Sequence, residues 1–131
     1  MTTSLHLTLL STEYAVCQLP PEAESPAWAR GGELLSFTRT VDEFSIVCSS
    51  ALVPANVKAE MGWRALKVAG PLEFSLVGIL ASLASALANA GVSIFALSTF
   101  DTDYILVKSD TLDRALAALK EAGFRIGEMN K

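Results

Sequence analysis

Residues 93–108 read SIFALSTFDTDYILVK, and this stretch decides the fold. It contains two runs rich in aliphatic and aromatic residues, separated by a tight turn at Asp101-Thr102. Such a pattern predicts a β-hairpin, with strands over residues 93–100 and 103–108. The segments before and after it are therefore expected to join the same sheet.

The segments that flank this hairpin alternate between strand and helix patterns. Residues 64–70 alternate polar and apolar side chains and end in a Gly-Pro turn, which predicts a strand. Apolar residues then recur at helical spacing up to Gly91, and again from residue 112 up to Gly123. With a short last strand at 124–127, the order is βαββαβ. This order predicts a ferredoxin-like α+β fold, an antiparallel sheet with both helices on one face.

The N-terminal half is less regular. Residues 5–10 and 14–19 are predicted strands joined by a turn near residues 11–13, and three prolines exclude a long helix from the loop that follows. Residues 34–38 and 44–49 form a second predicted hairpin. Residues 54–61 are a candidate short helix followed by a connector.

The two predicted hairpins resemble each other. A shift of 60 positions aligns residues 37–38 with 97–98, 43–44 with 103–104, and 46–47 with 106–107. The alternative is chance similarity between two β-hairpins. We interpret the match as a tandem pair of related domains, a degenerate one at residues 1–61 and a complete one at residues 62–131.

Composition excludes several classes of protein. Of the 131 residues, 51% are hydrophobic and 18% are charged, so the chain has enough apolar surface for a core and is not a disordered tail. A net charge of −4 argues against nucleic-acid binding. The 27 positions from Phe74 to Phe100 carry no charge, but serines and alanines interrupt them, which favours a buried helix and strand over a membrane span. No secretory signal is expected, and the protein is predicted to be cytoplasmic.

The chain offers little for metal binding or catalysis. Cys17, Cys48 and His6 cannot supply the four ligands of a zinc site, so no metal or cofactor is expected. Buried, reduced thiols are the simpler interpretation of the cysteines, and a disulfide is the alternative. Neither a Ser/Cys–His–acid arrangement nor a glycine-rich phosphate motif is present. We therefore predict that the protein is not an enzyme.

Two stretches resemble a known family. WRALKVAGPLEFSLVGIL at residues 63–80 and LSTFDTDYILV at residues 97–107 look like tandem ACT-domain proteins, in particular a short bacterial group similar to aspartate-kinase regulatory domains and to the animal cytosolic arginine sensors. The resemblance covers nearly the whole chain and is most specific over Trp63–Lys108. It implies tandem ferredoxin-like ACT domains that bind a small amino acid and act through a homodimer or a protein partner.

The start of the helix after Pro71 is a candidate site for the carboxylate of an amino acid. Free backbone amides at a helix N-terminus attract anions, and those of Val77, Gly78 and Ile79 open this helix. Gly78 has no side chain to shield them. The alternative is that Gly78 only lets the helix pack closely on the sheet.

Asp103 is the candidate partner for the ammonium group. It begins an apolar strand directly after the turn, where the carbonyls of Ser98 and Thr99 are expected to support it. Ordinary turn chemistry is the alternative for both aspartates, and we favour it for Asp101. The amino acid would then be held by opposite charges at its two ends, at the interface of the two domains.

Three further residues are candidates for the ligand's side chain. Glu73 and Glu43 are predicted to face a cationic side chain, although solvated loop acids are the alternative. Phe100 either lines the pocket or belongs to the core. Two competing functions stay open: an acylphosphatase-like enzyme on the same scaffold, and a purely oligomerising module.

Overall fold

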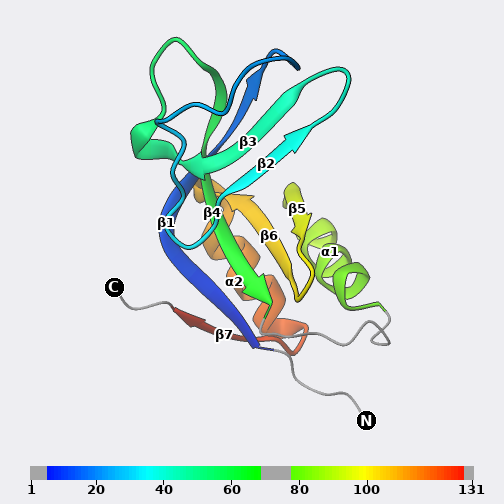
Figure 1. The fold of residues 1–131 in the computed structure, drawn as a ribbon. Helices are drawn as coiled ribbons and strands as arrows, with labels where there is room; N and C mark the ends of the chain where they lie inside the picture. The colour runs from blue at the N-terminus through cyan, green and yellow to red at the C-terminus, as the bar shows by residue number, and fades with distance from the viewer. Residues whose placement is uncertain (1–5, 69–77, 129–131) are drawn as a thin grey trace. The chain divides into compact units, whose positions relative to one another are not determined.

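The computed structural model describes residues 6–68 and 78–128, which form two compact units. The helical unit contains residues up to Ser11 and from Arg64 onward, and the loop unit contains Thr12–Trp63. In chain order (Figure 1) the elements are β1 (His6–Leu19), β2 (Ser36–Arg39), β3 (Phe44–Ser49), β4 (Lys58–Val68), α1 (Ile79–Asn89), β5 (Ile94–Ser98), β6 (Asp103–Lys108), α2 (Leu112–Glu121) and β7 (Arg125–Glu128), with 3₁₀ turns at Ser50–Leu52 and Ser109–Thr111.

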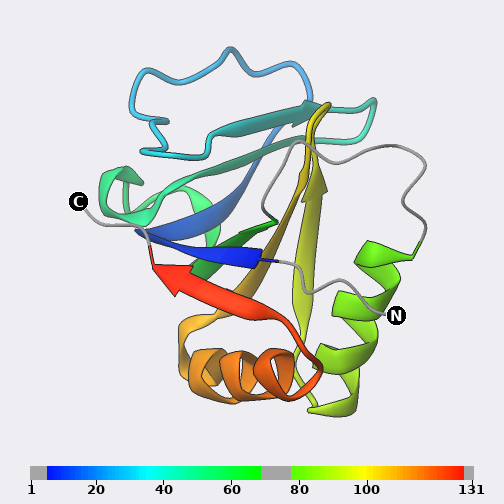
Figure 2. The ribbon, with the colours of Figure 1, turned by 90° about the horizontal axis from the view of Figure 1, so that it is seen from below.

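The helical unit has the predicted βαββαβ order, from β4 through α1, β5, β6 and α2 to β7. Both helices cover the same face of its sheet (Figure 2). The strands lie in the order β7–β1–β4–β6–β5, with β7 parallel to β1 and β5 antiparallel to β6. The ferredoxin-like α+β prediction is confirmed, and β1 adds a strand from the start of the chain between β7 and β4.

The core of the helical unit lies between the sheet and the two helices. Leu83 and Leu87 are one turn apart on α1, as are Ala115 and Leu119 on α2, so each pair faces the sheet. The buried side chains of this core are Leu7, Leu9, Leu66, Val68, Leu83, Leu87, Val92, Ile105, Val107, Ala115 and Leu119. Burying one such aliphatic side chain contributes about 1.5–3 kcal/mol, so this cluster is the main stabilising feature of the unit.

The first strand differs from the prediction. Two strands with a turn near residues 11–13 were expected, but β1 is one continuous strand of 14 residues. Its partner changes along its length: His6–Leu9 pairs with β7, whereas Tyr14–Leu19 pairs with β3. The polar residues between these two stretches mark the change of partner, and the chain stays extended through them.

The segment at residues 54–61 also differs from the prediction. No helix forms there, because residues 54–57 make a turn and β4 begins at Lys58. Val57 and Ala59, two positions apart, pack against the core of the loop unit, which is strand spacing. A short 3₁₀ turn at Ser50–Leu52 precedes this turn.

The loop unit is built on the antiparallel pairs β2–β3 and β3–β1. Residues 20–35, here called the covering loop, contain turns but neither helix nor strand. Gly31 is required there because a Cβ atom at this position would lie 1.9 Å from the carbonyl oxygen of Leu34. The buried core of this unit consists of Ala15, Cys17, Ala29, Phe44, Ile46 and Cys48.

The two hairpins repeat each other, but with a different offset from the predicted one. The last cross-strand pairs are Arg39–Phe44 in β2–β3 and Ser98–Asp103 in β5–β6. The step from Arg39 to Ser98 is 59 positions, and so is the step from Phe44 to Asp103. The predicted alignment by 60 positions is therefore wrong by one residue. Asp103 therefore corresponds to Phe44, and Glu43 corresponds to Thr102.

Candidate ligand-binding site

Ser98 and Asp103 close the β5–β6 hairpin as its last paired residues. The Ser98 hydroxyl Oγ donates a hydrogen bond of 2.6 Å to Asp103 Oδ1. Asp103 is half-buried and Ser98 is exposed. Because an ionised carboxylate has about four acceptor positions, this bond orients the Asp103 carboxylate and leaves acceptor positions for a cation.

The turn between these strands is held by Thr99 and Thr102. The Thr99 amide donates to the Thr102 carbonyl at 2.8 Å, and the Thr102 amide donates back to Thr99 Oγ1 at 3.3 Å. Thr102 is buried, and its Oγ1 donates to the Val68 carbonyl at 2.5 Å. The sequence did not single out Thr102, yet this residue ties the turn to the end of β4.

Phe100 and Asp101 form the tip of this turn. The Phe100 side chain is 82% exposed, so the alternative that it belongs to the core is wrong. Asp101 is exposed as well. The two turn-tip residues are thus accessible to a ligand, whereas Thr102 is not.

The helix expected after Pro71 is α1, and its start contains two of the predicted site residues, Gly78 and Ile79. Gly78 is the N-cap residue with φ of +87°, and nothing lies within 4 Å of the position a Cβ atom would occupy. The glycine is therefore needed for its backbone conformation, and close packing on the sheet does not explain it. Among the described residues, no side chain caps this helix start, and the side chain of Ile79 packs on the core. Val77 and Glu73 lie outside the described residues.

Two predicted halves of the site lie at one end of the helical unit. Along the chain, α1 leads through a short connection into β5, which runs back toward the level of the start of α1 (Figure 1). The β5–β6 turn with Asp103 is therefore at the same end of the unit as Gly78. A carboxylate on the hairpin and a partial positive charge at the helix start suit the two ends of an amino acid.

Glu43 lies in the loop unit and has partners there. Its Oε1 accepts hydrogen bonds from Gln18 Nε2 at 3.0 Å and from Ser45 Oγ at 3.2 Å. Its Oε1 atom thus accepts two side-chain hydrogen bonds from neighbouring strands, and Asp103 Oδ1 accepts the one from Ser98.

Comparison with known proteins identifies the family. A family model described as "ACT domain" matches residues 58–121, and a second model, which describes an N-terminal domain, matches residues 12–56. A protein from Agrobacterium tumefaciens with a known crystal structure is 37% identical in sequence to this chain. The match covers 99% of this chain and 97% of that protein's chain, and the two structures superpose with a TM-score of 0.92. The chain belongs to the ACT-domain family. ACT domains are regulatory domains that bind amino acids, as the resemblance implied.

Two further comparisons are informative for this ACT-domain protein. The cytosolic arginine sensor for mTORC1 subunit 1 of Homo sapiens is 37% identical over 59 residues, which is 44% of this chain but only 18% of that protein. The regulatory subunit of aspartate kinase from Thermus flavus is 12% identical in sequence, and the match covers 92% of this chain and 97% of that subunit's chain. The two structures superpose with a TM-score of 0.59, so they share the fold.

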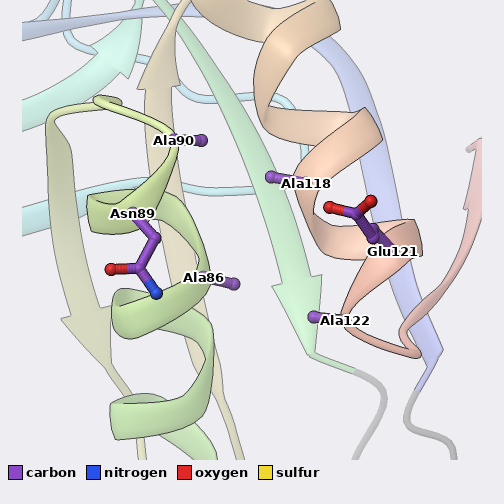
Figure 3. A pocket seen from close by; sticks show the side chains of 6 residues that line it. All are labelled: Ala86, Asn89, Ala90, Ala118, Glu121 and Ala122. Carbon is purple, nitrogen blue, oxygen red and sulfur yellow. The ribbon is translucent and has the colours of Figure 1, made fainter.

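A separate groove of about 330 Å³ lies between the ends of α1 and α2 (Figure 3). Its lining residues are Ala86, Asn89, Ala90, Ala118, Glu121 and Ala122. It lies at the last turn of α1, whereas Gly78 is at the first, roughly 16 Å away along a helix of 11 residues. The groove is therefore distinct from the predicted site of this ACT domain.

Within residues 6–68 and 78–128, no three histidine, cysteine or acidic side chains are grouped so that they could bind a metal ion. In the same residues, none of the helices has the length and apolar content that crossing a membrane requires.

Proposed function

We propose that this ACT-domain protein binds one free α-amino acid at the end of its helical unit that carries Asp103 and the start of α1. The observation that supports this most directly is the Asp103 carboxylate, half-buried and oriented by the 2.6 Å hydrogen bond from Ser98. A carboxylate with a fixed orientation and spare acceptor positions suits the ammonium group that every α-amino acid carries.

The other end of the ligand is assigned to the start of α1. Its first backbone amides have no partner within the helix, and the helix dipole adds partial positive charge there. None of the described side chains caps the helix at Gly78. The amides of Gly78 and Ile79, together with that of Val77, are therefore proposed to face the ligand carboxylate. The carbonyls of Ser98 and Thr99 complete the ammonium site.

The side chain of the ligand is proposed to be cationic. The curated relative that matches 59 residues is named as an arginine sensor, which makes arginine the first amino acid to test. Glu73 and Glu43 are the acids predicted to meet such a side chain, and the exposed Phe100 ring is predicted to cover its aliphatic part.

The effect of binding is proposed to pass through another protein chain, either a second copy in a homodimer or a regulated partner. Strands β2 and β5 are edge strands of the sheet, and natural proteins usually cover such edges. The relative named as an arginine sensor is cytosolic by its name, and a cytoplasmic location is proposed for this chain as well.

The test begins with a thermal-shift screen of the twenty amino acids and an acyl phosphate. A ligand that binds the folded state raises the melting temperature. Calorimetry with the amino acid identified by the screen then compares wild type with Asp103→Asn, which keeps the shape and removes the charge. A hydrogen bond to a charged group is worth roughly 1.5–3 kcal/mol, so the variant should bind about ten- to a hundredfold more weakly.

Asp101→Asn is the matched control, because Asp101 is an exposed acid two positions away in the same turn. It should bind the ligand as tightly as wild type. Equal losses for both variants would mean that the turn conformation, and not the Asp103 charge, holds the ligand. Stabilisation by the acyl phosphate alone would favour the enzyme alternative.

A further inference from the structure

Arg39 makes an unusual set of contacts for an exposed side chain on a sheet edge. Its guanidinium nitrogens donate to two carbonyls of the covering loop, Pro21 O and Ala23 O, the latter at 2.7 Å. The guanidinium carbon also lies 4.0 Å from the centre of the Phe44 ring. One side chain thus joins the β2–β3 hairpin to the beginning of the covering loop.

The rest of the covering loop is attached by separate bonds. The Ser49 amide donates to the Arg30 carbonyl at 2.6 Å, and the Leu34 amide donates to the Tyr14 hydroxyl at 3.2 Å. These bonds hold the second half of the loop to β3 and β1. The first half, near Pro21 and Ala23, is held to the hairpin by Arg39, so the two halves of the loop are attached by different bonds.

Two thiols lie in the core that this loop covers. Cys17 and Cys48 are 1% and 0% exposed, and they share one buried cluster with Phe44 and Ala29. Ala23 and Trp28 of the covering loop pack against that cluster. In the register of β1 and β3, Cys17 pairs with Ile46 and Cys48 with Ala15, so the thiols occupy diagonal positions on one face.

We propose that the first half of the covering loop is a lid over the Cys17–Cys48 pair, that Arg39 holds this lid closed, and that the pair is a modification site for small thiol-directed electrophiles when the lid opens. The thiolate is the nucleophile that attacks such reagents. Burial raises the pKa of both thiols, that of Cys48 to about 12, so neither ionises at neutral pH while the lid is closed. Opening would restore both access and ordinary acidity.

The test is the rate at which native protein reacts with a small aromatic disulfide reagent at pH 8, followed by the absorbance of the released thiolate. In that reaction a cysteine thiolate attacks the reagent's disulfide, forms a mixed disulfide and expels the coloured aromatic thiolate. Arg39→Ala removes the charged hydrogen bonds of the lid and should accelerate the reaction about ten- to a hundredfold. Arg39→Lys should show a smaller increase, because an ammonium group lacks the two-pronged geometry that reaches both carbonyls.

Arg30→Ala is the matched control, because Arg30 is an exposed arginine in the second half of the same loop and its backbone carbonyl remains. It should react at the wild-type rate. Hydrogen exchange on the same proteins should show faster exchange at Ala23 in Arg39→Ala and unchanged exchange in α1. The proposal would be overturned if the thiols of Arg39→Ala reacted at the wild-type rate. It would also be overturned if hydrogen exchange in α1 accelerated by the same factor as the thiol reaction.

Discussion

The β2–β3 and β5–β6 hairpins have the same turn but different closing pairs. Each turn begins with a threonine, Thr40 or Thr99, whose amide donates at 2.8 Å to the carbonyl three residues later. Each has an exposed apolar residue at the next position, Val41 at 91% and Phe100 at 82% exposure. The closing pair, however, is Arg39 with Phe44 in one hairpin and Ser98 with Asp103 in the other.

This difference separates the turn that both hairpins share from the closing pairs, whose side chains form different hydrogen bonds. The threonine-based turn is a shared scaffold, since it is the same in both units. In the loop unit the closing pair supplies a cation that binds the chain's own carbonyls, whereas in the helical unit it supplies an acid with acceptor positions to spare. The covering layers differ as well: the covering loop packs on the core of the loop unit, and two helices pack on the core of the helical unit.

The largest expected effect compares the two covering layers. Ile46 and Ile105 occupy matching positions and are 0% and 1% exposed. Ile→Ala substitutions in a core cost about 2–5 kcal/mol, and the cost is greater where the surroundings cannot collapse into the cavity. Ile105→Ala, under two helices, should lose more unfolding free energy in urea titrations than Ile46→Ala, under a loop. A larger loss at Ile46 would contradict this view of the covering loop.

The next effect depends on pH and compares Cys48 with Val107, its counterpart in β6. Burial raises the pKa of Cys48 from 9.0 to about 12. Between these values the thiol is ionised in the unfolded chain but protonated in the folded one. Its contribution to stability is therefore complete below pH 9 and decreases as the pH rises toward 12, by about 1.4 kcal/mol per pH unit.

Cys48→Val introduces the residue of the matching strand and removes this titration. Urea unfolding at pH 8 and pH 10 should show a loss of stability in wild type that exceeds the loss in Cys48→Val by about 1.4 kcal/mol. Identical pH dependence in the two proteins would show that Cys48 ionises normally in the folded state.

A smaller effect tests the shared turn. Thr40→Val removes a hydroxyl that accepts backbone amide hydrogen bonds from Asp42 and Glu43, both at 3.1 Å. Thr99→Val removes one that accepts such a bond from Thr102 at 3.3 Å. Each variant should lose about 0.5–1.5 kcal/mol of unfolding free energy in the absence of ligand. Because Thr40 accepts the additional bond from Asp42, its loss should equal or exceed that of Thr99. A clearly larger loss at Thr99 would argue against an equivalence of the turns at a step of 59 positions.

The smallest effect on stability is expected at the turn tips. Val41→Ser and Phe100→Ser replace exposed side chains, so each should change the unfolding free energy by less than about 0.5 kcal/mol. Calorimetry with the identified amino acid should distinguish them, because Phe100→Ser should weaken binding several-fold and Val41→Ser should leave it unchanged. Equal affinities would remove Phe100 from the proposed site.

The sequence by itself determined the elements of the helical unit. The alternation before Gly70, the helical spacing of apolar residues and the two runs around Asp101-Thr102 are local patterns, because each depends on neighbours within a turn or a few strand positions. The same reasoning singled out Asp103, an acid at the start of an apolar strand. The resemblance of residues 63–80 and 97–107 led to the ACT-domain family, and hence to the proposal of an amino-acid ligand.

Only the tertiary structure decided which segments meet. The continuity of β1, the strand in place of a helix after residue 57 and the step of 59 positions between hairpins all depend on pairing between distant segments. Local patterns could not assign the bond from Thr102 to Val68 or the contact of Arg39 with the covering loop. These contacts join residues far apart in sequence, so their formation depends on the packing of the whole unit rather than on the preference of any short segment.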